Sequence, residues 1–165
     1  MSRTETLVDA DHVLPRLYIG SFSSQDKLEL LRPRPNIVIS AAKEVPPEMA
    51  DGLITKHIPL VDTDIDWKRT PKTWNAVMAT GRYIAERYMQ GDTILVICYG
   101  GINRSSLIVG VALRYLGFTG PQALQQIQNT RGSTGIVLTR PCFRNAILYM
   151  TPSVVLPYTK IKSHQ

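Results

Sequence analysis

Several features that mark large classes of protein are scarce or missing in this sequence. It has two cysteines in 165 residues, too few for the disulfide framework of a small secreted domain. No spacing of cysteine, histidine and acidic residues is typical of a metal site, so no metal or other cofactor is expected. The apolar runs are too short to cross a bilayer, and there is no internal repeat or low-complexity segment.

The start of the chain does not have the composition of a secretion signal. Residues 1–11 are polar and include the acidic side chains Glu5, Asp9 and Asp11. A signal peptide instead has a basic start followed by an apolar run. The scarcity of cysteine and the absence of such a signal favour a reducing compartment. We therefore expect a cytoplasmic protein that can also enter the nucleus.

The composition is that of one ordered domain. Hydrophobic residues make up 44% of the chain and charged residues 19%, which argues against disorder, and the length allows a sizeable core. The net charge of +6 favours anionic partners such as phosphoproteins or RNA. Most basic residues are scattered as on a solvated surface, although Lys68, Arg69 and Lys72 lie together after an acidic segment. No membrane partner is expected.

One segment of the sequence combines a cysteine, two glycines and an arginine. It consists of Cys98, Tyr99, Gly100, Gly101, Ile102, Asn103, Arg104 and Ser105. Apolar residues 93–96 precede it and apolar residues 107–113 follow it, which predicts a buried strand, a tight loop and a helix in that order. The cysteine and the arginine are therefore expected at the N-terminus of a helix.

This arrangement is suited to binding a phosphate dianion and attacking it with sulfur. Backbone N–H groups of a turn that enters a helix converge on one point, and the helix dipole adds positive potential there. The planar fork of Arg104 matches two phosphate oxygens. The same field favours the thiolate of Cys98, which is the nucleophilic form of cysteine. The hydroxyl of Ser105 can reach back to the sulfur and make it a better leaving group.

The pattern Cys98-x-x-Gly101-x-x-Arg104-Ser105 resembles the signature loop of the cysteine-dependent protein tyrosine phosphatase superfamily. Other segments resemble its dual-specificity branch: residues 13–20 its opening strand, residues 36–41 its second strand, residues 57–62 the segment carrying the general acid, and Pro141-x-Phe143 the start of its last helix. The resemblance implies one α/β domain with a central, mostly parallel, twisted sheet of four to five strands flanked by helices. Residues 11–150 would form the catalytic domain, preceded by an extension over 1–10 and followed by a tail over 151–165.

The resemblance also implies an activity and a set of catalytic residues. Members of this branch hydrolyse phosphotyrosine and phosphoserine or phosphothreonine in proteins through a phosphocysteine intermediate. Cys98 would be the nucleophile, residues 98–104 the phosphate-binding loop and Ser105 the group that assists sulfur as it leaves. The order of motifs points to Asp62 as the general acid and base. The usual interval to the cysteine instead favours Asp66, so both remain candidates.

One departure from the family pattern leaves other functions open. The residue before the nucleophile is usually a histidine that helps to hold the loop, and this chain has Ile97 there. A catalytically weak or inactive module that binds phosphorylated partners is therefore an alternative. The run Ile102-Asn103-Arg104 also resembles RNA 5′-phosphatases of the same superfamily. An RNA 5′-triphosphatase or diphosphatase that uses the same cysteine is the other alternative.

The expected secondary structure alternates between strands and helices. Strands are predicted near residues 16–19, 36–40, 55–59 and 93–97, and helices over 23–31, 74–89, from 121 and over 143–150. Ser23 and Asp26 are predicted to form a capping box at the start of the first helix. Cys142 is expected to be structural in the last helix, with a resolving thiol for Cys98 as the alternative.

Overall fold

A five-stranded sheet forms the centre of the computed structural model, which describes residues 8–132, 135–156 and 158. The strands are β1 Ala10–Leu14, β2 Leu17–Ser21, β3 Ile37–Ala42, β4 Ile54–Leu60 and β5 Ile94–Cys98, in the spatial order β1-β2-β5-β3-β4. β5 pairs in parallel with β2 and β3, β3 pairs in parallel with β4, and β1 runs antiparallel at the edge. The predicted α/β fold with a mostly parallel sheet is confirmed.

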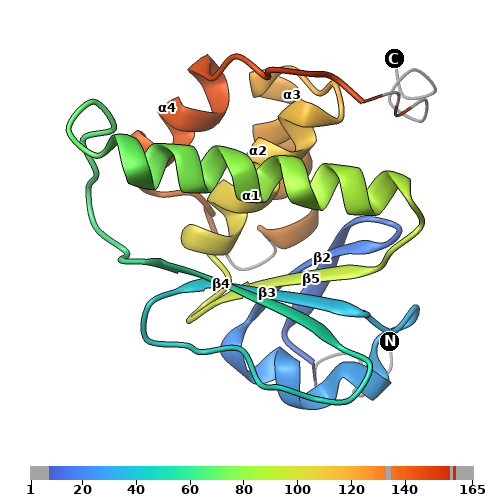
Figure 1. Ribbon diagram of the computed structural model, residues 1–165. Coiled ribbons are helices and arrows are strands. Elements are labelled where there is room, and N and C mark those ends of the chain that lie inside the picture. The colour runs from blue at the N-terminus through green and yellow to red at the C-terminus, as the bar shows by residue number, and fades with distance from the viewer. Residues whose placement is uncertain (1–7, 133–134, 157, 159–165) are drawn as a thin grey trace.

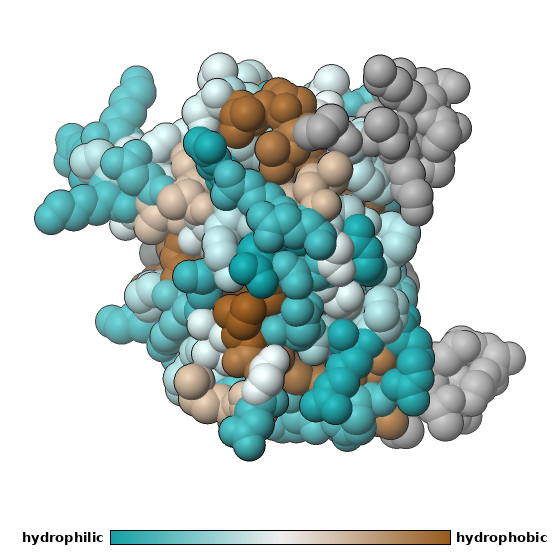
Figure 2. All heavy atoms as spheres, turned by 45° about the vertical axis from the view of Figure 1, so that its right-hand side comes forward, coloured by the Kyte–Doolittle hydropathy of each residue, from teal (hydrophilic) through white to brown (hydrophobic). Residues whose placement is uncertain are grey.

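Helices cover the two faces of the sheet unequally. The α helices are α1 Pro71–Met89, α2 Arg104–Tyr115, α3 Gly120–Arg131 and α4 Pro141–Tyr149. All four lie on one face in Figure 1, and the 3-10 segment η2, Phe22–Leu30, lies on the other. α2 packs between the sheet and the other helices, so its side chains are buried almost all round. In Figure 2 hydrophilic side chains cover most of the visible face, and the apolar patches on it are small and separate.

The central strand β5 is buried on both faces because the sheet separates two apolar clusters. Ile94 and Val96 point into the larger cluster beneath the α helices, whereas Leu95 and Ile97 belong to the smaller cluster on the η2 side. Strand residues alternate between faces, so a continuous apolar run is what a doubly covered strand requires. β5 therefore delivers Cys98 to the carboxyl edge in the middle of the sheet, where ligands of parallel α/β proteins bind.

Local details differ from the sequence prediction in three places. Residues 13–20 do not form one strand but end β1 and form most of β2. Helix α1 begins earlier than predicted, at Pro71, whose missing N–H is tolerated in a first turn. The predicted capping box at Ser23 is wrong, because the segment is a 3-10 helix that begins at Phe22, and the Ser23 hydroxyl contacts the hydroxyl of Ser21.

The described part of the C-terminal tail contacts the end of α2. Leu156 donates its backbone N–H to the Tyr115 carbonyl at the end of α2, so the described tail packs against the domain. The proposed limits of 1–10, 11–150 and 151–165 stay a prediction. Within the described part of the chain, no helix is long and apolar enough to cross a membrane.

Candidate active site

The junction between β5 and α2 forms a tight loop around the sulfur of Cys98. Cys98 is the last residue of β5 and is only 2% exposed. Gly101 has a positive φ of 69°, which lets the chain turn back so that its N–H donates to Cys98 Sγ at 3.2 Å. The Ser105 hydroxyl lies 3.2 Å from the same sulfur, in the first turn of α2. The two groups give a thiolate two hydrogen-bond donors.

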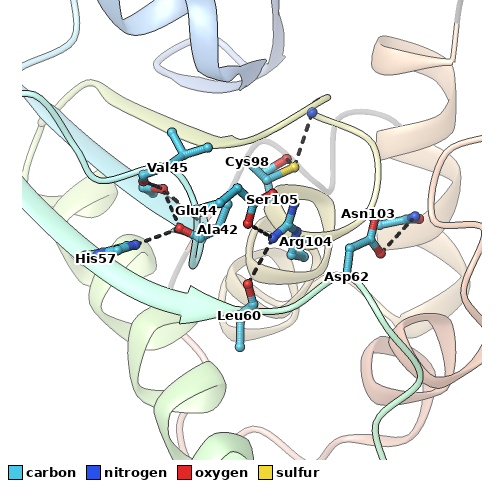
Figure 3. A network of polar contacts seen from close by, with 12 residues as sticks. Ala42, Glu44, Val45, His57, Leu60, Asp62, Cys98, Asn103, Arg104 and Ser105 are labelled. Carbon is cyan, nitrogen blue, oxygen red and sulfur yellow. Dashed lines mark hydrogen bonds and ion pairs between the residues drawn. The ribbon is translucent and has the colours of Figure 1, made fainter.

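Arg104 is the first residue of α2 and is held by a carboxylate from another part of the chain. Its Nη1 and Nη2 each donate to one oxygen of Glu44 at 2.6 Å, and Nη1 also donates to the Leu60 carbonyl at 3.0 Å (Figure 3). The Arg104 side chain is 5% exposed, and its Nε is buried without a partner among the described residues. A buried donor of this kind lacks a hydrogen bond that a phosphate oxygen can accept.

Glu44 therefore acts as a support for the arginine, and the sequence analysis missed it. Glu44 follows β3 at the carboxyl edge of the sheet, and hydrogen bonds from Arg104 lower its pKa to about 2. The pair consequently stays ionised through the neutral range. An acidic residue just after a buried strand next to β5 was the available signal, but nothing local in the sequence connects it with Arg104.

Asp62 shares the recess with Cys98, whereas Asp66 does not line it. Asp62 lines a recess of about 550 Å³ together with Cys98 and Arg104. Its Oδ1 accepts hydrogen bonds from Arg140 Nε at 2.5 Å and from Asn103 Nδ2 at 3.4 Å. Asp66 is not among the residues that line the recess; it pairs with Arg69 on the surface at 3.5 Å. The geometry thus favours Asp62 as the group that faces the sulfur loop.

The segment that carries both aspartates is fixed at its far end by tryptophan. Trp67 donates its Nε1–H to the Cys142 carbonyl at 2.9 Å and packs edge-on against Trp74, with ring centroids 5.3 Å apart. Cys142, the second residue of α4, accepts a hydrogen bond on sulfur from the backbone of Ile65 at 3.4 Å. Cys142 is not among the residues lining the recess, which favours its structural role.

A second buried arginine holds the loop from outside. Arg131, at the end of α3, donates from Nε to the Gly101 carbonyl at 3.0 Å and from Nη2 to the Gly100 carbonyl at 3.2 Å. Its Nη1 pairs with Asp9 at 2.8 Å and with Asp11 at 2.9 Å. These bonds hold two loop carbonyls on the guanidinium of Arg131. The sequence analysis did not identify Arg131, since its role depends on three segments that meet only in the fold.

Four further residues of the loop line the recess. Tyr99, Gly100, Ile102 and Asn103 line it, and Asn103 also accepts the backbone N–H of Thr139 at 2.7 Å. Ile97, where the family usually has histidine, is fully buried in the smaller apolar cluster and supplies no hydrogen bond to the loop. Among the described residues no group of histidine, cysteine and acidic side chains could hold a metal ion.

Known proteins resemble this chain in sequence and in fold. No protein-family model matches the sequence. The chain is 35% identical over 113 residues to the tyrosine-protein phosphatase MSG5 of Saccharomyces cerevisiae; the match covers 64% of this chain and 21% of the yeast protein. The chain therefore spans about a fifth of the length of that curated relative.

Two solved structures have a similar fold over most of the chain. The crystal structure of human DUSP28 matches with a TM-score of 0.71 and 20% identity, over 84% of this chain and 89% of that one. DUSP15 matches with a TM-score of 0.68 and 25% identity, over 84% and 85%. The fold of the chain is therefore shared with these two phosphatase structures. The chain is thus similar in sequence to a tyrosine-protein phosphatase and in fold to dual-specificity phosphatases.

Removing the support of Arg104 is expected to weaken anion binding and turnover. Glu44→Gln keeps one hydrogen bond to the guanidinium, and Glu44→Ala keeps none. We expect kcat/KM for an aryl phosphate to fall about 10-fold and about 100-fold respectively, as losses of charge-assisted hydrogen bonds do. Inhibition by orthovanadate should weaken in parallel. Glu29→Gln, an exposed carboxylate on η2, is the matched control, and equal activity in all three variants would contradict the role of Glu44.

The ion pair between Glu44 and Arg104 predicts that the stability of the fold depends on pH. The folded pKa of Glu44 is about 2 and its ordinary value is 4.5, so the stabilisation from the ionised form is complete above 4.5 and is lost as pH falls towards 2. The difference in free energy of unfolding between wild type and Glu44→Gln should thus be constant from pH 8 to 5 and shrink below pH 4. Urea unfolding at each pH measures it, and a difference that grows on acidification would contradict the pairing.

Arg131 is expected to matter for catalysis because it orients the loop carbonyls. Arg131→Met removes four hydrogen bonds at once and should reduce kcat for an aryl phosphate by about 100-fold. Arg131→Lys keeps the positive charge and should retain a higher kcat than Arg131→Met. Arg144→Met, which changes an exposed arginine in α4, is the matched control. A folded Arg131→Met protein with wild-type kcat would show that the loop does not need this clamp.

Proposed function

We propose that this chain is a protein phosphatase that hydrolyses phosphotyrosine and phosphoserine or phosphothreonine monoesters through a phosphocysteine intermediate. The observation that supports it most directly is the recess lined by Cys98, Asp62 and Arg104, in which the Nε of Arg104 is buried without a partner among the described residues. A nucleophile, an anion receptor and an acid are the three groups that phosphate ester cleavage requires. The dual-specificity relatives support the same reaction.

In the first step the Cys98 thiolate attacks phosphorus and the ester P–O bond breaks. Asp62, as the acid, gives its proton to the departing oxygen, so the alcohol or phenol leaves neutral. Arg104 and the loop N–H groups bind the phosphoryl oxygens as charge redistributes on them. The products of this step are the dephosphorylated protein and phosphocysteine at position 98.

In the second step water attacks the phosphocysteine and the P–S bond breaks. Asp62, now ionised, takes a proton from the water and returns to its starting form. The Ser105 hydroxyl, 3.2 Å from the sulfur, donates a hydrogen bond to the thiolate as it leaves. Inorganic phosphate is released, and Cys98 is again a thiolate.

The lining of the recess supports protein monoesters over RNA ends as substrates. Arg104 is the cation among the described lining residues, and it faces two carboxylates, Glu44 and Asp62. A 5′-triphosphate carries several more negative charges than a monoester and needs more cations to bind. RNA therefore remains the less favoured partner. The free thiols of Cys98 and Cys142 suit the reducing cytoplasm that we propose as the location, with the nucleus also accessible.

The mechanism predicts how three variants behave. Cys98→Ser should abolish hydrolysis of both para-nitrophenyl phosphate and a phosphopeptide. Asp62→Asn should lower kcat on the phosphopeptide by about 100-fold or more, the usual contribution of a general acid, and less on para-nitrophenyl phosphate, whose leaving group needs little protonation. Asp66→Asn is the matched control and should stay within about twofold of wild type.

The alternatives give different results in the same assays. Turnover that survives Cys98→Ser would overturn the phosphocysteine mechanism. Binding of the phosphopeptide without hydrolysis at any pH from 5 to 9 would favour a non-catalytic module, for which the buried Ile97 is the supporting observation. Release of phosphate from triphosphate-ended RNA faster than from phosphopeptides would instead favour the RNA 5′-phosphatase.

A further inference from the structure

The mouth of the catalytic recess is bordered by exposed apolar side chains. Tyr99, Ile102 and Ile136 line the recess with exposed fractions of 59%, 45% and 72%, and Phe22, 42% exposed, stacks on Tyr99. We call these four residues the apolar rim. They come from the catalytic loop, from the start of η2 and from the segment before α4. Exposed apolar side chains that gather at a binding site are a common mark of a contact surface.

Two members of the apolar rim form a preformed platform. The rings of Phe22 and Tyr99 are nearly parallel, with an interplanar angle of 17° and centroids 4.9 Å apart. Phe22 also donates its backbone N–H to the Tyr99 carbonyl at 3.2 Å, so the backbone holds the stack in register. Because Tyr99 directly follows the nucleophile, the platform lies beside the phosphate site. A rigid aromatic surface loses little conformational entropy when a partner side chain packs on it.

The charges of the recess do not favour acidic neighbours of the phosphate. Glu44 and Asp62 line it, and their carboxylates pair with Arg104 and Arg140. Arg104 is the cation in the described lining, and under the proposed function its unpartnered Nε is taken up by the phosphate. An acidic residue next to the phosphorylated residue would thus meet carboxylates and no free cation. A bulky apolar residue would meet the rim.

We propose that the apolar rim selects phosphoprotein segments in which a large aliphatic or aromatic residue lies next to the phosphorylated residue. The proposal rests on the function inferred above and specifies the substrate class of the same site. Water leaves both surfaces when the flanking side chain packs against Phe22, Tyr99 or Ile136, and this favours binding of the extended substrate. A small aryl phosphate, which has no flanking residue, does not use the rim.

Three phosphopeptides of equal length test the proposal. They share one phosphorylated residue and differ in both flanking residues, which are leucine, serine or glutamate. We expect kcat/KM to be about 10-fold higher for leucine than for serine, as one added apolar contact commonly gives, and lower for glutamate than for serine. Phe22→Ser and Ile136→Ser should each reduce the leucine-to-serine ratio towards one. Val155→Ser, an exposed apolar residue of the tail, should leave that ratio unchanged and is the matched control.

The outcomes separate this inference from the proposed function. Equal kcat/KM for the three peptides, or a preference for glutamate, would overturn the role of the apolar rim while leaving the phosphatase activity intact. A leucine-to-serine ratio that stays high in both Phe22→Ser and Ile136→Ser would also overturn it. Hydrolysis of none of the peptides by the folded protein would remove the proposed function and the inference together.

Discussion

Burial of two arginines is the constraint on which the catalytic loop depends. A guanidinium can leave water only where carboxylates and carbonyls accept its charge and its hydrogen bonds. Glu44 and the Leu60 carbonyl do this for Arg104, and Asp9, Asp11 and two loop carbonyls do it for Arg131. The loop is therefore fixed by the β3 and β4 edges on one side and by β1 and α3 on the other. Its shape is a property of the whole sheet edge.

Arg104 and Arg131 have different roles at the loop. Arg131 donates hydrogen bonds to the carbonyls of Gly100 and Gly101 and fixes the backbone, whereas the Nε of Arg104 is buried without a partner among the described residues. The hydrogen bonds from Arg131 explain how the loop keeps its conformation although Ile97 replaces the usual histidine. Ile97 strengthens the apolar cluster behind the loop, and the hydrogen bonds that order the loop come from α3 instead.

The sequence predicted those parts of the fold and of the candidate site whose signals lie in consecutive residues of the chain. The run through β5, the loop and α2 carries its own strand, turn and helix signals, so the sequence alone brings Cys98, Arg104 and Ser105 together as candidates. Glu44 and Arg131 could not, because they meet the loop across 60 and 30 residues of chain. The capping box predicted at Ser23 is wrong because a short polar segment fits either an α helix or a 3-10 helix, and this one forms a 3-10 helix with Leu28 buried in the smaller apolar cluster.

The tryptophan pair gives the protein an optical property. The sequence contains two tryptophans, Trp67 and Trp74, and they lie in contact where the segment with Asp62 joins the helices. Indole emission depends on its surroundings, and Trp67 is half-buried with its N–H on the Cys142 carbonyl. Any shift of the acid-bearing segment would change that environment while the rest of the chain contributes no competing indole. Intrinsic fluorescence can therefore follow this segment in solution without a label.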